Sequence, residues 1–127
     1  MRGNWAWNGK TNASVLTSEG ETDRAKGDKG NVRARWVHLD GLVNGKFTGI
    51  AGMGHPGNFR SPEPVRLNAA EPYFNFTPQQ AGDMEIAPGK PFVGRYRFVV
   101  ADGQPDKAEL ERIWNDYAHP PMVKVSQ

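Results

Sequence analysis

The sequence predicts a mainly β fold, an antiparallel β-sandwich with one short C-terminal α-helix. Segments that alternate apolar and polar residues with a period of two recur along the chain, most clearly over residues 91–101. Fifteen glycines and ten prolines indicate many turns, which argues against a helical bundle. A helical period occurs only near the C-terminus, so the strand–helix units of a parallel sheet are not expected. A length of 127 residues fits a single domain, residues 1–127.

The first half of the chain supplies four expected strands, at residues 2–8, 13–19, 31–40 and 46–53. Asn8-Gly9 and Asn44-Gly45 are typical hairpin turns. The polar residues 20–30 are expected to form a loop. Within the third strand, the alternation places Ala34 and Trp36 on the same face. The glycines of the fourth strand predict a bulge or a close approach by another backbone or a ligand.

The second half begins with an irregular loop over residues 54–72, which holds four prolines. A short aromatic strand at residues 73–76 follows, and then the long strand at residues 91–101. Alternation places Tyr96 and Phe98 on one face of this last strand.

A helix is predicted over residues 106–118. Its apolar stripe has helical spacing and consists of Leu110, Ile113, Trp114 and Tyr117. Asp106 fits the N-cap position, and Glu109 stands three residues later, as in a capping box. Pro120 and Pro121 stop the helix, and residues 123–125 are expected to return as an edge strand.

Composition excludes several classes of function. Sixteen basic and 14 acidic residues leave a net charge of +2, which gives no indication of nucleic-acid binding. The absence of cysteine excludes disulfides, thiolate metal sites and a cysteine nucleophile. No apolar run approaches the ~20 residues of a membrane helix, and the N-terminus lacks the apolar region of a signal peptide. We therefore expect a cytoplasmic protein without a membrane partner or cofactor.

The loop at residues 55–64 carries the main candidate binding site. His55 is a candidate acid, base or donor, and the other polar members are Asn58, Arg60 and Glu63. Amide, carboxylate and guanidinium groups suit the paired hydroxyls of a sugar. The alternative is a rigid structural loop in which proline fixes the backbone and Asn58 caps a turn. We favour this interpretation, because long proline-rich connections often have only a structural role.

Two pairs of arginines form a second candidate. Arg33 and Arg35 project from one strand, and Arg95 and Arg97 from another. If the strands are neighbours, Arg35 and Arg97 belong to a cationic face for acidic ligands. An exposed face whose arginines pair with acidic side chains is the favoured alternative.

Histidines and tryptophans complete the candidates. His38, His55 and His119 are too far apart for a metal motif, so no metal site is predicted, although His38 and Asp40 fall on one strand face. Trp5, Trp7 and Trp36 have rings suited to stacking on a sugar or to the core. The alternation around Trp36 favours the core for that residue.

A family resemblance rests on several segments in order. They are Val15–Gly20, Ala34-Arg35-Trp36, residues 55–64, Tyr73-Phe74-Asn75-Phe76, Pro88-Gly89-Lys90, residues 96–100, the helix ending in Trp114, and Pro120-Pro121. In this order and spacing the chain resembles the C-terminal part of the PmoA-like family, bacterial β-sandwich proteins named after a methane oxygenase. The resemblance implies a truncated galactose-mutarotase-like sandwich associated with carbohydrate metabolism. Oxygenase chemistry is not expected, because it requires a membrane-embedded metal site.

The resemblance also implies an uncovered core face or strand edge, since members of the family are usually much longer. Such surfaces are normally covered or paired, so we expect a homo-oligomer, most simply a twofold dimer. Three functions stay open: a carbohydrate-related binding module, a small sugar-active enzyme using His55 or Glu63, and a truncated structural or interaction module without a small ligand.

Overall fold

The computed structural model describes residues 13–29 and 32–126. The predicted strand at residues 2–8, its Asn8-Gly9 turn, Trp5 and Trp7 lie outside these residues. Within them, the predicted fold class is confirmed: two antiparallel sheets and one C-terminal helix make up most of the regular structure.

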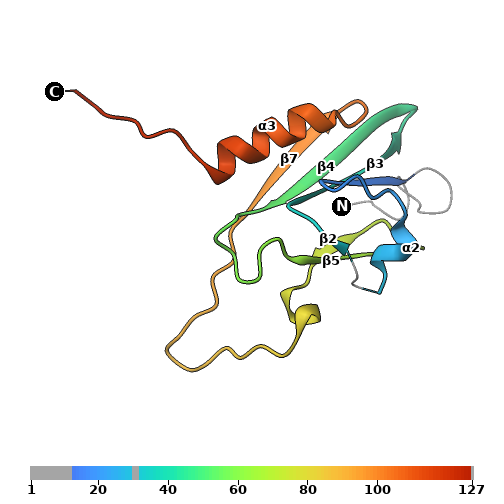
Figure 1. The fold of residues 1–127 in the computed structure, drawn as a ribbon. Helices are drawn as coiled ribbons and strands as arrows, with labels where there is room; N and C mark the ends of the chain where they lie inside the picture. The colour runs from blue at the N-terminus through green and yellow to red at the C-terminus, as the bar shows by residue number, and fades with distance from the viewer. Residues whose placement is uncertain (1–12, 30–31, 127) are drawn as a thin grey trace.

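The strands divide into a four-stranded and a three-stranded sheet (Figure 1). The four-stranded sheet has the order β1 (Ser14–Thr17), β3 (Trp36–Val43), β4 (Lys46–Gly54) and β7 (Tyr96–Asp102). The three-stranded sheet has the order β2 (Val32–Arg33), β5 (Pro64–Leu67) and β6 (Phe74–Phe76). The tight hairpin between β3 and β4 turns at Asn44 and Gly45, which both adopt positive φ, as predicted from that sequence pair.

The inner faces of the two sheets share one apolar core. The four-stranded sheet contributes Val15, Val37 and Leu39, and β5 contributes Val65 and Leu67, all 5% exposed or less. Burying this many aliphatic side chains from both sheets is what holds them together, at roughly 1.5–3 kcal/mol for each side chain.

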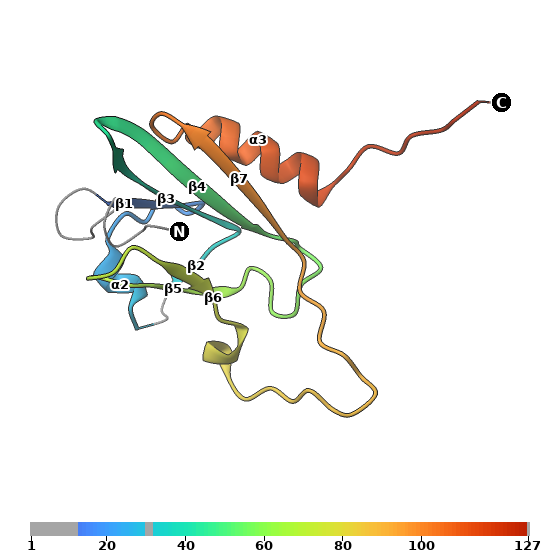
Figure 2. The same ribbon diagram turned by 180° about the vertical axis from the view of Figure 1, so that it is seen from behind.

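The outer face of the four-stranded sheet is covered by helix α3 (Lys107–Ala118), as Figure 2 shows from behind. Leu110 and Trp114 of the predicted stripe are buried against Trp36 and Met53 of the sheet. Asp106 caps the helix by accepting hydrogen bonds from the backbone N–H groups of residues 108 and 109. The predicted helix is thus confirmed to within a residue. None of the helices in the described part of the chain has the length and apolar character needed to cross a membrane.

The predicted strand at residues 31–40 is two strands that belong to different sheets. The chain leaves β2 after Arg33, crosses between the layers at residues 34 and 35, and enters β3 at Trp36. Ala34 therefore lies in the core between the sheets, whereas Trp36 lies under α3. The expectation that Ala34 and Trp36 share a face was wrong, because a strand that changes sheets does not keep its alternation.

Other boundaries also differ from the predictions. The loop at residues 20–30 contains a short helix, α2 (Arg24–Gly27), whose N-cap Asp23 accepts a hydrogen bond from the backbone of residue 25. The loop at residues 54–72 contains the buried strand β5, and a 3₁₀ turn, η1 (Pro78–Ala81), follows β6. Strand β7 begins only at residue 96, and residues 123–125 are not a strand. Residues 120–126 instead extend away from the sheets in both views (Figures 1 and 2).

Candidate functional site

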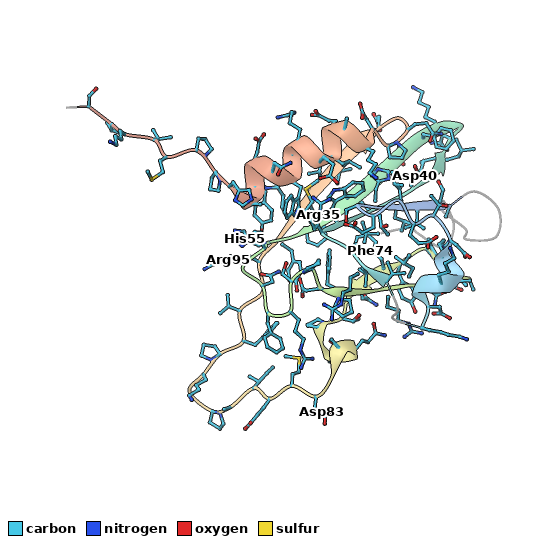
Figure 3. The ribbon with its side chains drawn as sticks, viewed as in Figure 1. Arg35, Asp40, His55, Phe74, Asp83 and Arg95 are labelled. Atoms are coloured by element: carbon cyan, nitrogen blue, oxygen red, sulfur yellow. The ribbon has the colours of Figure 1, made fainter. Side chains whose placement is uncertain are left out.

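The loop between β4 and β5, residues 55–63, is fastened to the start of β7 by Asn58. The Asn58 side-chain amide donates to the backbone carbonyl of Arg95 at 2.9 Å and accepts from its backbone N–H at 2.8 Å. The same amide donates to Glu63 at 3.0 Å. Figure 3 shows His55 and Arg95 side by side at this junction, and their backbones also hydrogen-bond. Asn58 is only 6% exposed, so its polar atoms face the protein and not a ligand.

Glu63 is one of the most deeply buried side chains, at 2% exposure. Its second carboxylate oxygen accepts a hydrogen bond of 2.7 Å from the Tyr96 hydroxyl. Burial and this hydrogen bond raise the pKa of Tyr96 above its ordinary value, so the phenol stays protonated and keeps donating. Glu63 therefore links the loop to the beginning of β7.

Arg60 is held by backbone carbonyls. Its guanidinium donates to the carbonyls of Pro78, Gly82 and Asp83, at 2.6 to 2.8 Å, which ties the loop to η1 and the segment after it. The backbone of Arg60 has a φ of 62°, a left-handed conformation that costs a non-glycine residue about 1 kcal/mol. The three hydrogen bonds offset this strain and leave the guanidinium engaged within the protein.

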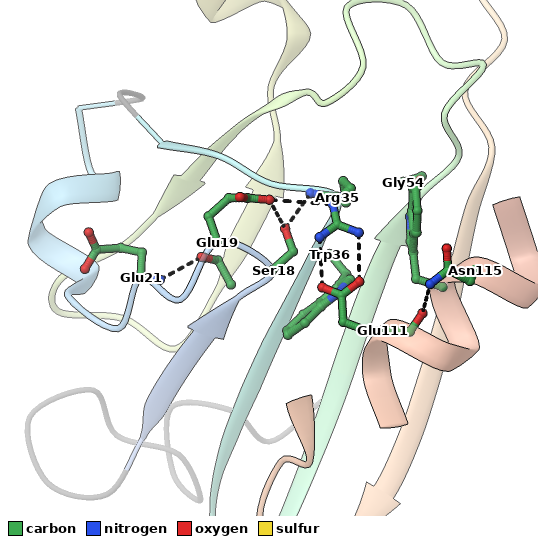
Figure 4. Close-up of polar contacts among 10 residues, drawn as sticks. Ser18, Glu19, Glu21, Arg35, Trp36, Gly54, Glu111 and Asn115 are labelled. Atoms are coloured by element: carbon green, nitrogen blue, oxygen red, sulfur yellow. Dashed lines mark hydrogen bonds and ion pairs between the residues drawn. The ribbon is translucent and has the colours of Figure 1, made fainter. Parts of the chain in front are cut away.

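Arg35 lies between α3 and the sheet (Figure 4). Both of its terminal nitrogens donate to the carboxylate of Glu111 at 2.8 Å, and its guanidinium lies 4.7 Å from the centre of the Trp114 ring. The indole N–H of Trp36 donates to the same Glu111 carboxylate. The hydrogen bonds from Arg35 to Glu111 raise the pKa of Arg35 above its ordinary value. Arg35 acts as a clamp that holds α3 on the sheet.

His55 and Arg97 meet the same residue of α3. The His55 ring packs edge-on to the Tyr117 ring, and the Arg97 guanidinium lies 4.5 Å from the centre of that ring. The Nδ1 atom of His55 accepts a hydrogen bond from the backbone N–H of Gly57. The structure thus brings His55 and Arg97 to one side of the helix, while Glu63 faces the interior.

A buried polar cluster lies on the face of the four-stranded sheet that carries α3. His38 and Asp40 project from the same face of β3, as predicted, and their Nδ1 and Oδ2 atoms are 3.7 Å apart. Asp40 also accepts a hydrogen bond from Ser14 on β1. Burial lowers the pKa of His38 and the neighbouring Asp40 opposes that shift, so the imidazole is held neutral. Among the residues that the structure describes, no group of three or more acidic and histidine side chains could hold a metal ion.

An aromatic cleft lies away from these residues, between β7 and β6. It has a volume of about 390 Å³. Its lining consists of Leu39, Ile50, Pro72, Tyr73, Phe74, Asn75, Phe76, Tyr96 and Phe98. None of the six predicted binding residues lines it. The signal that could have found it is the pair of aromatic segments at residues 73–76 and 96–98, which are predicted strands whose rings face the same core.

The polar atoms of this cleft are largely engaged. The Tyr96 hydroxyl donates to Glu63, and the Tyr73 hydroxyl accepts from the Asn68 side chain at 2.8 Å. The ring of Phe74 lies against Gly52, where a Cβ atom would come within 2.8 Å of it. The glycines of β4 predicted a bulge or a close approach by another backbone or a ligand; at Gly52 the close neighbour is instead an aromatic side chain.

The cleft continues onto an uncovered part of β7. Phe98 is 62% exposed and Val100 is 76% exposed, because the short strand β6 does not extend over them. β7 is also the last strand of its sheet, so in the described part of the chain its outer backbone edge is unpaired. The Phe98 and Val100 side chains, this edge and the cleft form one surface, which we name the β7 surface.

The fold defines the class of protein: a small mainly-β module with an apolar strand edge beside an aromatic cleft. Residues 1–115 match the model of a family described as a family of unknown function, DUF6807, and since the match covers most of the chain, the protein belongs to this family. No curated protein and no solved structure matches the chain. The resemblance to the PmoA-like family stays a prediction.

Proposed function

We propose that this protein is an interaction module that binds an extended apolar polypeptide segment along the outer edge of β7. This is the third of the three functions that the sequence left open. The observation that carries it is the β7 surface, where an edge that no strand among the described residues pairs with adjoins exposed Phe98 and Val100 and the aromatic cleft. A segment added to such an edge satisfies its backbone on the strand and places alternate side chains in the cleft.

The centre of β7 lacks the features that protect natural sheet edges. Residues 98–101 read Phe-Val-Val-Ala, with neither a charge nor a proline. Exposed edges are ordinarily blunted by lysine, proline, a bulge or a covering element. An edge whose centre is unprotected and carries two large exposed side chains favours a partner in the working state.

A sugar fits this surface less well. Carbohydrate hydroxyls need polar partners, but the tyrosine hydroxyls of the cleft are engaged with Glu63 and Asn68. The amide of Asn58 and the guanidinium of Arg60 are likewise engaged within the protein. Carbohydrate binding and sugar-active catalysis through His55 or Glu63 stay predictions. Loss of activity on His55→Ala with binding retained would favour catalysis.

A selection of linear peptides displayed on phage tests the proposal against a glycan array. Val100→Asp is the test variant, because Val100 is 76% exposed and its substitution leaves the core intact. Ile86→Asp is the matched control, at 63% exposure on the segment between η1 and β7. We expect peptides with alternating apolar residues to bind the native protein and the control but not Val100→Asp. Enrichment of glycans with no peptide, or peptide binding that survives Val100→Asp, would refute the proposal.

A further inference from the structure

We infer that the segment occupying the β7 surface is residues 122–126 of a second copy of this chain, exchanged reciprocally in a twofold dimer. This inference rests on the proposed function and names its partner. The observations that carry it are the exposure, the sequence pattern and the direction of the segment that follows α3.

The segment has the pattern of a strand that lacks a sheet. Met122, Val123 and Val125 are 92%, 83% and 86% exposed. Alternation places Val123 and Val125 on one face and Lys124 on the other. Once paired with β7, it would direct both valines toward Phe98 and the cleft and place Lys124 on the face of the sheet that carries α3.

The length of the segment suits the edge. Five extended residues span about 16 Å and the seven residues of β7 about 23 Å, so all five residues of the segment can pair along the edge. Each valine then meets an exposed apolar partner, Phe98 or Val100, in the arrangement that stabilises antiparallel pairs.

The direction of the segment favours a second copy over the same chain. Helix α3 runs back along β7 and ends at Ala118, near the start of that strand, where Tyr117 meets Arg97. Residues 120–126 continue away from the body in both views (Figures 1 and 2). Pairing with its own β7 would require a reversal at Pro120 and Pro121, whose rings fix φ and favour an extended backbone. In a twofold dimer each segment reaches the edge of the other copy without such a reversal.

Sedimentation velocity of the full chain over a range of concentrations tests the inference. We expect a species with twice the 14.1 kDa mass of one chain. The double variant Val123→Asp, Val125→Asp should raise the dimer dissociation constant by about tenfold or more, whereas the matched control Lys124→Ala should leave it within about twofold. Circular dichroism confirms that each variant keeps its fold, as the exposure of these residues predicts.

A peptide experiment separates this inference from the proposed function. A chain ending at Pro121 should stay monomeric and bind a fluorescent peptide of residues 120–127, and Val100→Asp should abolish that binding. The inference that a second copy supplies the segment is wrong if the full chain is monomeric at every concentration. It is also wrong if a dimer persists in the double variant. If that persistent dimer dissociates on Val100→Asp, the β7 surface still docks a polypeptide and only the identity of the segment fails. A dimer whose dissociation constant is unchanged by the double variant and by Val100→Asp would contradict both proposals.

Discussion

The hydrogen bonds of Asn58 offer a sharp test of the loop at residues 55–63, through the nearly isosteric change Asn58→Asp. The substitution keeps the oxygen that accepts from the Arg95 backbone but removes the donations to Glu63 and to the Arg95 carbonyl. A neutral hydrogen bond is worth about 1 kcal/mol and one to a charged group about 2 kcal/mol, so we expect a loss of about 3 kcal/mol in the free energy of unfolding at pH 7. Repulsion between two buried carboxylates adds to this loss.

Urea unfolding followed by tryptophan fluorescence measures this loss as a shift in the midpoint at constant slope. Asn75→Ala serves as the matched control, because Asn75 is exposed on β6, and its effect should stay within about 0.5 kcal/mol. The destabilisation by Asn58→Asp should shrink as the pH is lowered, because protonation removes the repulsion between the two carboxylates. An Asn58→Asp protein as stable as the native one at pH 7 would refute the assignment of Asn58 to the structure of the loop.

Three further predictions concern the sheet face that carries α3. A double-mutant cycle of Arg35→Ala and Glu111→Ala should give a coupling energy of about 1–2 kcal/mol. This energy should shrink in 1 M salt, since both side chains are partly exposed. Additive effects of the two single substitutions on the free energy of unfolding would contradict the role of Arg35 as a clamp. Burial lowers the pKa of His38 in the folded protein below the ordinary value of 6.5, so around and below this pH the unfolded chain binds more protons than the folded protein. The free energy of unfolding should therefore fall as the pH drops from about 7 to 5. A His38→Gln variant should show a flatter pH dependence, and an unchanged slope would assign the effect to other groups. Gly49→Ala places a Cβ atom 2.5 Å from the His38 ring and should cost about 1–3 kcal/mol by calorimetry, a penalty that a native-like melting temperature would rule out.

Periodicity predicted the elements whose surroundings stay constant along their length. Helix α3 packs on one sheet face throughout, so its stripe and its Asp106 cap could be read directly. The same method failed at residues 34 and 35, because local alternation carries no information about a crossing between sheets. It also missed β5, since Pro64 stands at the start of that strand and the prolines around it indicate a loop.

Residue type predicted which polar side chains matter but not the direction in which they point. Asn58 and Glu63 do come together, as the ligand-rim hypothesis required, yet both are buried and bonded to each other. Hydrogen-bonding groups that suit a sugar hydroxyl suit a backbone amide equally well, so composition alone cannot separate the two uses. The cleft escaped prediction for the opposite reason: its aromatic residues are typical of a core, and their exposure depends on how far β6 extends.

The structural loop and the β7 surface are connected, which gives the loop an indirect role in binding. Asn58 fixes Arg95, and Glu63 fixes Tyr96, so the loop sets the position at which β7 begins. An edge held in place before its partner arrives loses less conformational entropy on pairing. The conservative substitution Tyr96→Phe removes only the hydroxyl bonded to Glu63. It should therefore weaken binding of the peptide of residues 120–127, although Phe98 and Val100 are unchanged. Peptide affinity unchanged in a Tyr96→Phe protein of reduced stability would show instead that the edge does not depend on the loop for its order.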